Sequence, residues 1–385
     1  KPLGSPIADT DQQWSIPFCM RSSSSVSQCE FLTDSEQAID VSGGQCPSWV
    51  LPNANGSGYY RFTMEEAQWQ ALLAQFAKLE PTEQLSVIDS AFAAFEAGDL
   101  KPETLIQVVR LSAKSDKRQV VEAPLAYLAK YADHYVDPEQ QQNWQAFLGK
   151  LYAEKAKALA NSSDNENKLL YSELLGFLAL EARDKDARKL LQQNAEKFVG
   201  LNQPRDASAL NSDLYQSALT VAVQDSGKAF VEKLIEVRSE LDDPLFDNAS
   251  ANALGRVTEP ALLHTVHELA LSDNMGAREA FGLISNALAE PTLKAKNWDW
   301  LQANFSEVVA KIPEQWRRNT PRFASNFCDA GMLKQAQLLF TQQQKLVPGY
   351  QRALSQTEEG INLCIALKEQ GESLVNSVKP GADSP

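Results

Sequence analysis

The chain has 385 residues, of which 43% are hydrophobic, so it can form a folded globular protein with more than one structural unit. Acidic residues outnumber basic residues by 50 to 36, which gives a formal net charge of −14. A chain with this charge repels nucleic acid and anionic membranes unless basic side chains cluster locally. The basic pairs Lys117-Arg118 and Arg317-Arg318 are isolated, and no apolar run approaches the roughly 18 residues that span a bilayer. The composition therefore disfavours nucleic-acid binding and membrane insertion.

The first 62 residues have the pattern of short strands separated by turns. The candidate strands are 14–21, 29–32 and 38–41. Two further apolar runs, 49–51 and 59–62, flank a loop that is rich in Pro, Asn and Gly, and Gly and Asn tolerate the positive φ angles of tight turns. These runs predict a hairpin that closes the segment. Because so few strands rarely make a complete sandwich, we expect residues 1–62 to be a partial β-sandwich domain.

From Thr63 the hydrophobic period changes to that of helices. Thr63 and Glu66 match a capping box, and apolar residues then follow at helical spacing from Trp69. Short breaks, most of them at prolines, separate the helical segments up to the C-terminus, which predicts antiparallel neighbours. We therefore expect a mainly α fold, a HEAT-like α-solenoid of antiparallel helix pairs over residues 63–385. An ordinary helical bundle is the alternative, although so many helices in series rarely share one core.

The five cysteines do not have the spacing of a zinc knuckle or a redox dithiol. Cys29 and Cys46 lie in the strand-like segment, and Cys328 and Cys364 lie in the last predicted helices. Each pair is a candidate disulfide if the protein is exported, whereas all five cysteines stay reduced in a reducing compartment. The compartment is therefore open: periplasmic or secreted if the cysteines pair, and otherwise cytoplasmic.

The sequence offers few groups for catalysis. His264 and His267 lie three residues apart on a predicted helix, a spacing at which two imidazoles can hold zinc. The order His-Thr-Val-His-Glu matches neither His-Glu-x-x-His nor its inverse, and no acidic ligand stands out further downstream. The Gly-x-Ser-x-Gly, phosphate-loop and dinucleotide motifs are also missing, and a Cys–His nucleophile pair is an open alternative that chance pairing of five cysteines and three histidines would also explain. We expect no catalytic residue, metal or cofactor in this chain, and a zinc enzyme built on these two histidines is the disfavoured alternative.

Residues 49–61 resemble a segment of the zinc aminopeptidases of the aminopeptidase N family. In that family the pattern W-x-x-P-N-x-x-x-x-G-Y-Y-R ends a small β-sandwich domain, just before a large helical C-terminal domain. The matching residues, to which the resemblance gives a structural role, are Trp49, Pro52, Asn53, Gly56, Gly58, Tyr59, Tyr60 and Arg61. Weaker similarities follow the family's order along essentially the whole chain, at 14–17, 98–100, 254–255, 262–263, 298–304 and, with a bacterial-type ending, 321–329.

The catalytic groups of that family have no counterpart in this sequence. The family's His-Glu-x-x-His helix with a third Glu ligand, its Gly-x-Met-Glu-Asn segment for the substrate amine and its oxyanion tyrosine all precede the matching region. Tyr59 and Tyr60 belong to the sandwich motif instead. The resemblance therefore implies the C-terminal region of a bacterial zinc metallo-aminopeptidase, inactive alone, with the zinc in a missing catalytic domain. The start inside a β domain favours a piece of a longer enzyme over a natural protein that never had catalytic domains.

In that family the helical domain covers the zinc site and encloses a chamber that admits peptides. The resemblance thus implies a cover and substrate-chamber region, whose partners are the N-terminal and catalytic domains of the same polypeptide and peptide substrates. Arg317, Arg318 and Arg322 are the candidates for binding the carboxylate end of a peptide, with exposed or salt-bridged arginines as the alternative. A stand-alone α-solenoid that binds peptides or proteins without enzymatic activity is the alternative function.

Overall fold

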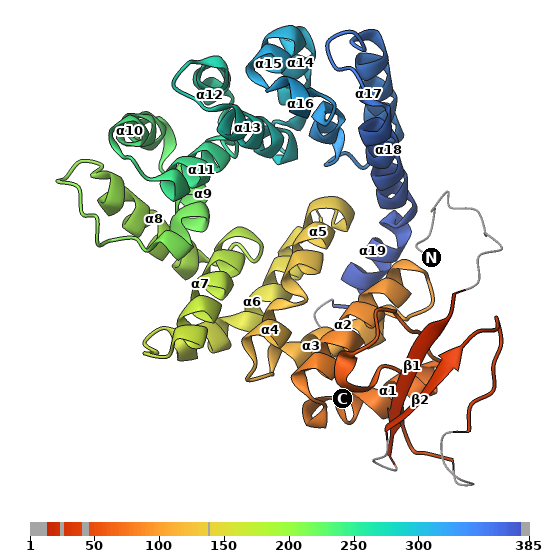
Figure 1. Ribbon diagram of the computed structural model, residues 1–385. Helices are drawn as coiled ribbons and strands as arrows, with labels where there is room; N and C mark the ends of the chain where they lie inside the picture. The colour runs from red at the N-terminus through yellow and green to blue at the C-terminus, as the bar shows by residue number, and fades with distance from the viewer. Residues whose placement is uncertain (1–13, 24–26, 41–45, 138, 379–385) are drawn as a thin grey trace. The chain divides into compact units, whose positions relative to one another are not determined.

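A computed structural model of the chain describes residues 14–23, 27–40, 46–137 and 139–378. The protein is mainly helical, with a small antiparallel sheet at its N-terminal end, which confirms the predicted fold class (Figure 1). Within these described ranges, no helix is both long and apolar enough to cross a membrane.

The sheet contains the three strands β1 (Ile16–Ser22), β2 (Ser27–Leu32) and β3 (Val50–Leu51), in the order β2-β1-β3. Both pairings are antiparallel. The predicted strand at 38–41 is wrong for residues 38–40, which have no regular structure, and Val41 lies outside the described residues. Residues 59–62 also form no strand, so the predicted closing hairpin is wrong. The described residues contain one sheet, and the partial β-sandwich stays a prediction.

The described residues include two disulfides. Cys19 lies directly opposite Cys29 in the β1–β2 register and is bonded to it, with 4.0 Å between the two Cα atoms. The expected Cys29–Cys46 pair is therefore wrong, because the strand register gives Cys29 a nearer partner and leaves Cys46 as an exposed thiol. The second disulfide joins Cys328 to Cys364, as the sequence suggested.

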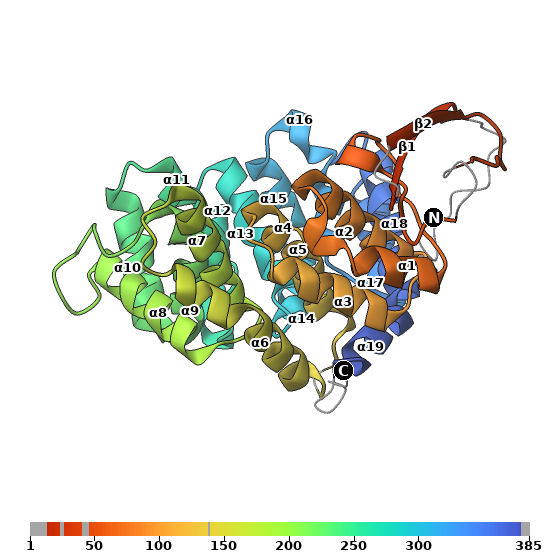
Figure 2. The ribbon, with the colours of Figure 1, turned by 90° about the horizontal axis from the view of Figure 1, so that it is seen from below.

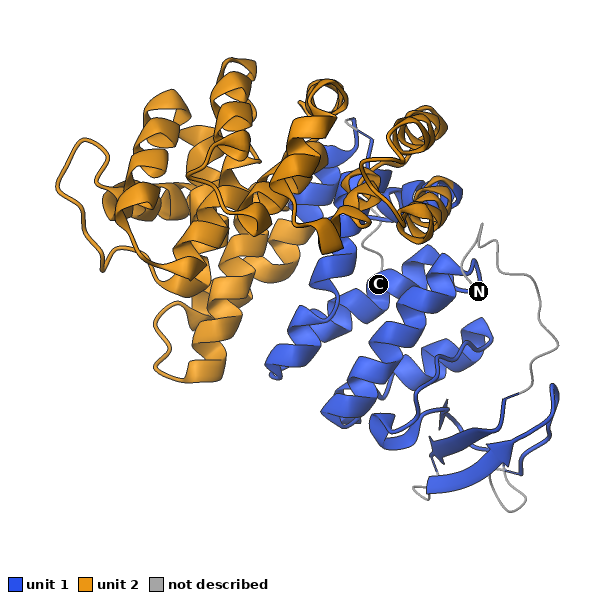
Figure 3. Cartoon of the chain, turned by 45° about the horizontal axis from the view of Figure 1, so that its top comes forward, with its two compact units in different colours: residues 1–147, 366–385 blue, residues 148–365 orange. Residues whose placement is uncertain are grey.

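The chain divides into two compact units, residues 1–147 with 366–385 and residues 148–365 (Figure 3). The expected domain boundary at residue 62 lies where strands give way to helices. The division into compact units falls elsewhere, inside helix α6 (Gln141–Leu159), and the sheet belongs to the first unit, where β3 contacts the first helix.

The first unit combines the sheet with helices around an aromatic core. Its helices are α1 (Glu66–Leu73), η2 (Phe76–Lys78), α2 (Pro81–Glu96), α3 (Pro102–Ala113), α4 (Arg118–Glu122), α5 (Leu125–Tyr135), the start of α6, and α19 (Lys368–Asn376). The predicted Thr63–Glu66 capping box is wrong by two residues, because Glu65 is the N-cap and its N–H donates to Gln68 Oε1 at 3.2 Å. The C-terminal helix α19 packs on α3 and α5, and Gly371 allows this close approach, since a Cβ there would lie 2.2 Å from Tyr135 Cβ.

The second unit is built from stacked helices. They are α7 (Asn165–Leu180), α8 (Lys185–Val199), η3 (Ser212–Leu214), α9 (Tyr215–Asp225), α10 (Gly227–Glu240), α11 (Pro244–Leu254), η4 (Pro260–Leu262), α12 (Leu263–Leu271), α13 (Ala277–Ala289), α14 (Lys294–Ala303), α15 (Phe305–Lys311), α16 (Glu314–Arg317), η5 (Thr320–Ala324), α17 (Ala330–Gln342) and α18 (Gln351–Ala366), most of which lies in this unit. From α7 to α11 each helix contacts the next, and the alternate helices α7, α9, α11 and α13 also contact one another in series (Figure 2). Such a double layer is the packing of helical-repeat proteins.

Candidate functional site

The junction loop, residues 52–58, is closed by the side chain of Asn53. Its Oδ1 accepts the N–H of Gly58 at 2.8 Å, and its Nδ2 donates to the carbonyl oxygen of Gly58 at 3.0 Å. Nδ2 also donates to Ser86 Oγ in α2 at 2.9 Å, and the Asn53 residue is only 2% exposed. These side-chain bonds replace the main-chain ladder of the predicted hairpin and fix the loop against α2.

The tip of the junction loop follows a tight left-handed path. It forms the short turn η1 (Ala54–Gly56), in which Asn55 has φ 59° and Gly56 has φ 62°. A Cβ on Gly56 would lie 2.5 Å from the carbonyl oxygen of Thr82. The loop therefore needs glycine here, both for its backbone conformation and for its contact with the start of α2.

Tyr60 connects the end of the junction to the sheet. Its hydroxyl donates to the carbonyl oxygen of Pro52 at 2.8 Å and accepts the N–H of Cys19 in β1 at 3.3 Å. Burial raises the pKa of this hydroxyl, while the hydrogen bond from Cys19 opposes the shift. Gly58 makes room for the ring, because a Cβ at that position would lie 2.1 Å from Tyr60 Cε1. Tyr60 thus has a structural role, as the motif implied.

Glu83, near the start of α2, is a buried carboxylate that joins three segments. It forms an ion pair with Arg21 of β1, accepts the N–H of Asn55 at 3.0 Å, and accepts the N–H of Glu80 at 3.0 Å as part of a capping box. Burying a charge is favourable only where partners of this kind surround it. The Pro81-Thr82-Glu83 signature pointed to a helix start, but the partner Arg21 was missed because nothing in the sequence relates β1 to α2.

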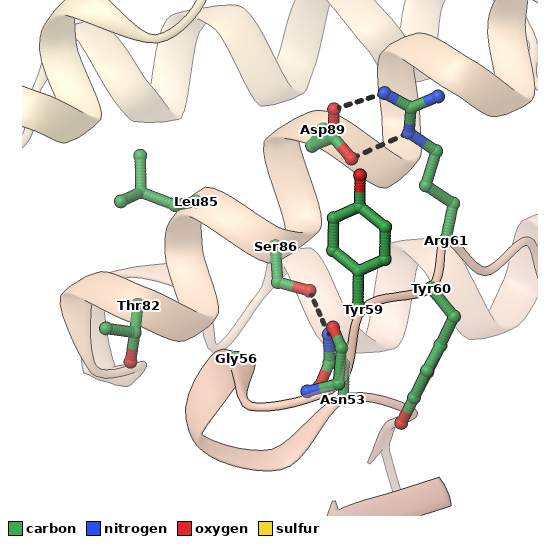
Figure 4. A pocket seen from close by; sticks show the side chains of 10 residues that line it. Asn53, Gly56, Tyr59, Tyr60, Arg61, Thr82, Leu85, Ser86 and Asp89 are labelled. Atoms are coloured by element: carbon green, nitrogen blue, oxygen red, sulfur yellow. Dashed lines mark hydrogen bonds and ion pairs between the residues drawn. The ribbon is translucent and has the colours of Figure 1, made fainter. Parts of the chain in front are cut away.

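A pocket of about 530 Å³ lies beside the junction loop. In Figure 4 the side chains of Tyr59 and Tyr60 point in different directions from neighbouring positions, and Tyr59 is fully exposed. Arg61 Nε and Nη2 donate to the two carboxylate oxygens of Asp89 at 2.7 and 3.0 Å (Figure 4). The pocket is lined by Asn53, Gly56, Gly58, Tyr59, Tyr60, Arg61, Thr82, Leu85, Ser86 and Asp89.

The charged side chains that line the junction pocket already have partners within the chain. Asp89 is occupied by Arg61 and by the hydroxyl of Tyr127, which donates to Asp89 Oδ1 at 3.3 Å. The ion pair with Asp89 raises the pKa of Arg61, so this guanidinium stays charged. Among the described residues that line the pocket, no nucleophile is paired with a base. Its lining combines an exposed tyrosine with polar side chains that are fixed by hydrogen bonds.

A second pocket brings together two of the three predicted peptide-binding arginines. It has a volume of about 320 Å³ and is lined by Arg318, Asn319, Arg322, Gly349, Arg352, Ala353 and Gln356. Arg317 does not line it, and its Nε donates to the carbonyl oxygen of Ile312 at 3.0 Å. Arg352 is the third arginine that lines this pocket. The sequence did not indicate its role, because Arg352 lies in α18 and the helix α17 separates it from Arg318 and Arg322. We refer to this cavity as the arginine pocket.

The two histidines of the metal alternative have different surroundings. His264 is exposed and lies 3.3 Å from Glu268, whereas His267 is buried with its ring stacked on Trp300. His267 Nε2 lies 2.8 Å from Asn297 Oδ1, and the Asn297 amide nitrogen donates to the carbonyl oxygen of Ala287, so the tautomer with its proton on Nε2 fits this contact. A protonated nitrogen cannot ligate a metal. Burial lowers the pKa of His267, and the ring acts as a packed core residue.

These features define a mainly helical protein with a small sheet, in which a hydrogen-bonded loop after the sheet is fixed to α2. The model of one family, the ERAP1-like C-terminal domain, matches residues 49–363, which is most of the chain. The chain therefore belongs to this family, the C-terminal domain of M1-family aminopeptidases. The match begins at Trp49, which is also the first residue of the W-x-x-P-N motif at 49–61. It confirms the expected aminopeptidase C-terminal region. It also implies further domains in the same polypeptide.

Proposed function

We propose that this chain is the non-catalytic cover of a zinc aminopeptidase, bacterial in type, and that it forms part of the chamber in which peptides lose their N-terminal residues. The family match over residues 49–363 carries this proposal. The lack of an aminopeptidase zinc motif in the sequence supports a role other than bond cleavage.

In our proposal His264 and His267 do not bind a catalytic zinc ion. His264 is exposed, whereas His267 is buried, stacked on Trp300 and held with its Nε2 against Asn297 Oδ1. Zinc, as a Lewis acid that activates water, belongs in our proposal to the catalytic domain of the same polypeptide. The contribution of this chain is to exclude water and to position the distal part of the peptide.

The arginine pocket is the proposed point of contact with the peptide. Arg318 and Arg322 are side chains at a single cavity, which suits capture of a carboxylate. Arg317, whose Nε is bound to Ile312, is proposed to stabilise the connection between α15 and α16 instead. This division refines the three-arginine hypothesis drawn from the sequence.

The disulfides suggest where the protein folds. Cys19–Cys29 and Cys328–Cys364 are of the kind that persist in oxidising surroundings. We therefore propose a periplasmic or secreted location.

The proposal is tested with amino-acyl anilides and with unstructured peptides of about ten residues. The purified chain, supplied with one equivalent of zinc, is expected to hydrolyse neither and to bind the peptides in a fluorescence anisotropy titration. Turnover that a chelator abolishes would contradict the non-catalytic role. A complete lack of peptide binding would contradict the chamber role.

A further inference from the structure

We propose that the arginine pocket selects ligands with two carboxylates, and that in the enzyme its ligand is the C-terminal end of a peptide whose last residue is Asp or Glu. This inference rests on the proposed function for the identity of the peptide. The preference for two carboxylates rests on the pocket alone.

The pocket is assembled from three separate segments. Arg318 directly follows α16, Arg322 lies in η5, and Arg352 lies in the first turn of α18. The chain turns into α18 at Gly349, which has φ +78° and where an added Cβ would lie 3.9 Å from Arg318 Cβ. The turn therefore places Arg352 beside arginines that precede it by a whole helix.

The charges in the pocket are not neutralised within the described part of the chain. Among the described residues, none of the three arginines has a carboxylate within ion-pair distance. Elsewhere in the same ranges arginines form ion pairs with carboxylates: Arg21, Arg61, Arg118, Arg188, Arg238 and Arg256. In a chain with a net charge of −14, three arginines without an ion pair gather at this one cavity. They create a positive potential that attracts an anion and raises its local concentration.

The size of the pocket leaves room for more than one anionic group. Its volume of about 320 Å³ corresponds to the liquid volume of roughly ten water molecules, which exceeds that of a single small oxyanion. Guanidinium groups bind carboxylates through paired N–H bonds, so one carboxylate leaves part of the charge of three arginines uncompensated. Two carboxylates on a short carbon chain use the cavity and its charge more fully.

The neutral lining suits a peptide. The side-chain amides of Asn319 and Gln356 can donate to and accept from the amide groups of a peptide backbone. Gly349 and Ala353 are the small residues of the lining, and the described lining includes no large apolar side chain. The pocket thus matches a polar, doubly charged chain end better than an apolar one.

The test uses the whole chain and a labelled ten-residue peptide in four forms. The peptide ends in Glu or in Gln, each with a free or an amidated C-terminus, so that one form has two carboxylates, two forms have one and one form has none. We expect the dissociation constant to rise about tenfold with each carboxylate removed, and added salt to weaken the doubly charged form most. Citrate and succinate are expected to displace it.

Single variants locate the site. Arg352→Gln is expected to weaken binding of the Glu-ended free acid at least tenfold and to leave the uncharged form unchanged. Arg278→Gln is the matched control, because Arg278 is an arginine on α13 that does not line the pocket. Circular dichroism confirms that both variants are folded.

The outcomes separate this inference from the proposed function. Equal affinity for Glu-ended and Gln-ended peptides, or binding that Arg352→Gln does not change, overturns the inference and leaves the chamber role standing. Citrate binding without any peptide binding supports the pocket chemistry and contradicts the chamber role. Tighter binding of pyrophosphate than of citrate overturns the carboxylate class, as does binding of none of these probes.

Discussion

Asn53 and Gly58 hold the junction loop closed through two hydrogen bonds between one side-chain amide and one backbone unit, at 2.8 and 3.0 Å. The same amide donates to Ser86 in α2. One buried side chain therefore fixes both the shape of the loop and its position on the helical part of the first unit.

Asn53→Ala should destabilise the first unit. The substitution leaves the N–H and the carbonyl oxygen of Gly58 without these partners, which costs about 2 kcal/mol in the free energy of unfolding. Urea denaturation followed by circular dichroism measures the change. The control is Asn362→Ala, at an exposed position on α18, which should alter stability by less than about 0.5 kcal/mol. Equal effects of the two variants would show that the Asn53 bonds do not stabilise the junction.

Two glycine substitutions should have opposite effects. Gly371→Ala places a methyl group 2.2 Å from Tyr135 Cβ, so it should destabilise the protein by about 3 kcal/mol or more, by forcing α19 away from α5. Gly360→Ala, in α18, meets nothing within 4 Å and should stabilise the protein by about 0.5–1 kcal/mol, because alanine favours helix. Thermal unfolding of both variants provides the comparison. If Gly371→Ala proved as stable as the parent chain, the packing of α19 described above would be incorrect.

Thiol counting tests the disulfides. The denatured, unreduced chain should react with one equivalent of a thiol reagent, at Cys46, and the reduced chain should react with five. Peptide mapping should recover Cys19 linked to Cys29 and Cys328 linked to Cys364. Five reactive thiols before reduction, or a Cys29–Cys46 peptide, would contradict the pairing.

His267 should make stability depend on pH below neutrality. Burial lowers the pKa of its folded form below the ordinary value of 6.5, so the unfolded chain binds the proton more readily. The contribution of His267 to stability is thus fully present above pH 6.5 and is lost as the pH falls from 6.5 toward the lower folded pKa.

The variant His267→Phe isolates this effect. It keeps an aromatic ring against Trp300 but cannot titrate, so the stability difference from the parent chain should shrink between pH 7.5 and pH 5.5. His264→Gln, at an exposed position, serves as the control and should show no such trend. A difference for His267→Phe that stays constant over this range would exclude a depressed pKa at this histidine.

The helical part of the fold was accessible from the sequence because its determinants are local. Apolar residues at helical spacing and Pro at the first turn of a helix, as in Pro81 of α2 and Pro102 of α3, predict a helix without knowledge of its neighbours. The Thr63–Glu66 error shows the limit of this approach. Thr63 and Glu65 are both polar residues that can serve as N-cap, and the pattern alone does not decide between them.

Features that depend on contacts between distant residues could not be predicted from local sequence patterns. The hairpin prediction failed because Asn53 and Tyr60 bond across the loop with their side chains, which the strand pattern of 59–62 does not reveal. The Cys29 pairing depends on the register of β1 and β2, and the place of Arg352 depends on the turn at Gly349. The motif at 49–61 could be recognised from the sequence although several of its residues contact distant segments, because the motif residues themselves lie close together in the chain.

The central proposal is that this chain is the C-terminal part of a zinc aminopeptidase. The most direct measurement is the nucleotide sequence immediately upstream of the codon for Lys1. We predict a continuous reading frame that encodes a His-Glu-x-x-His helix with a downstream Glu, preceded by the N-terminal domain. A start codon and signal peptide directly before Lys1 would contradict the account and favour a stand-alone binding protein.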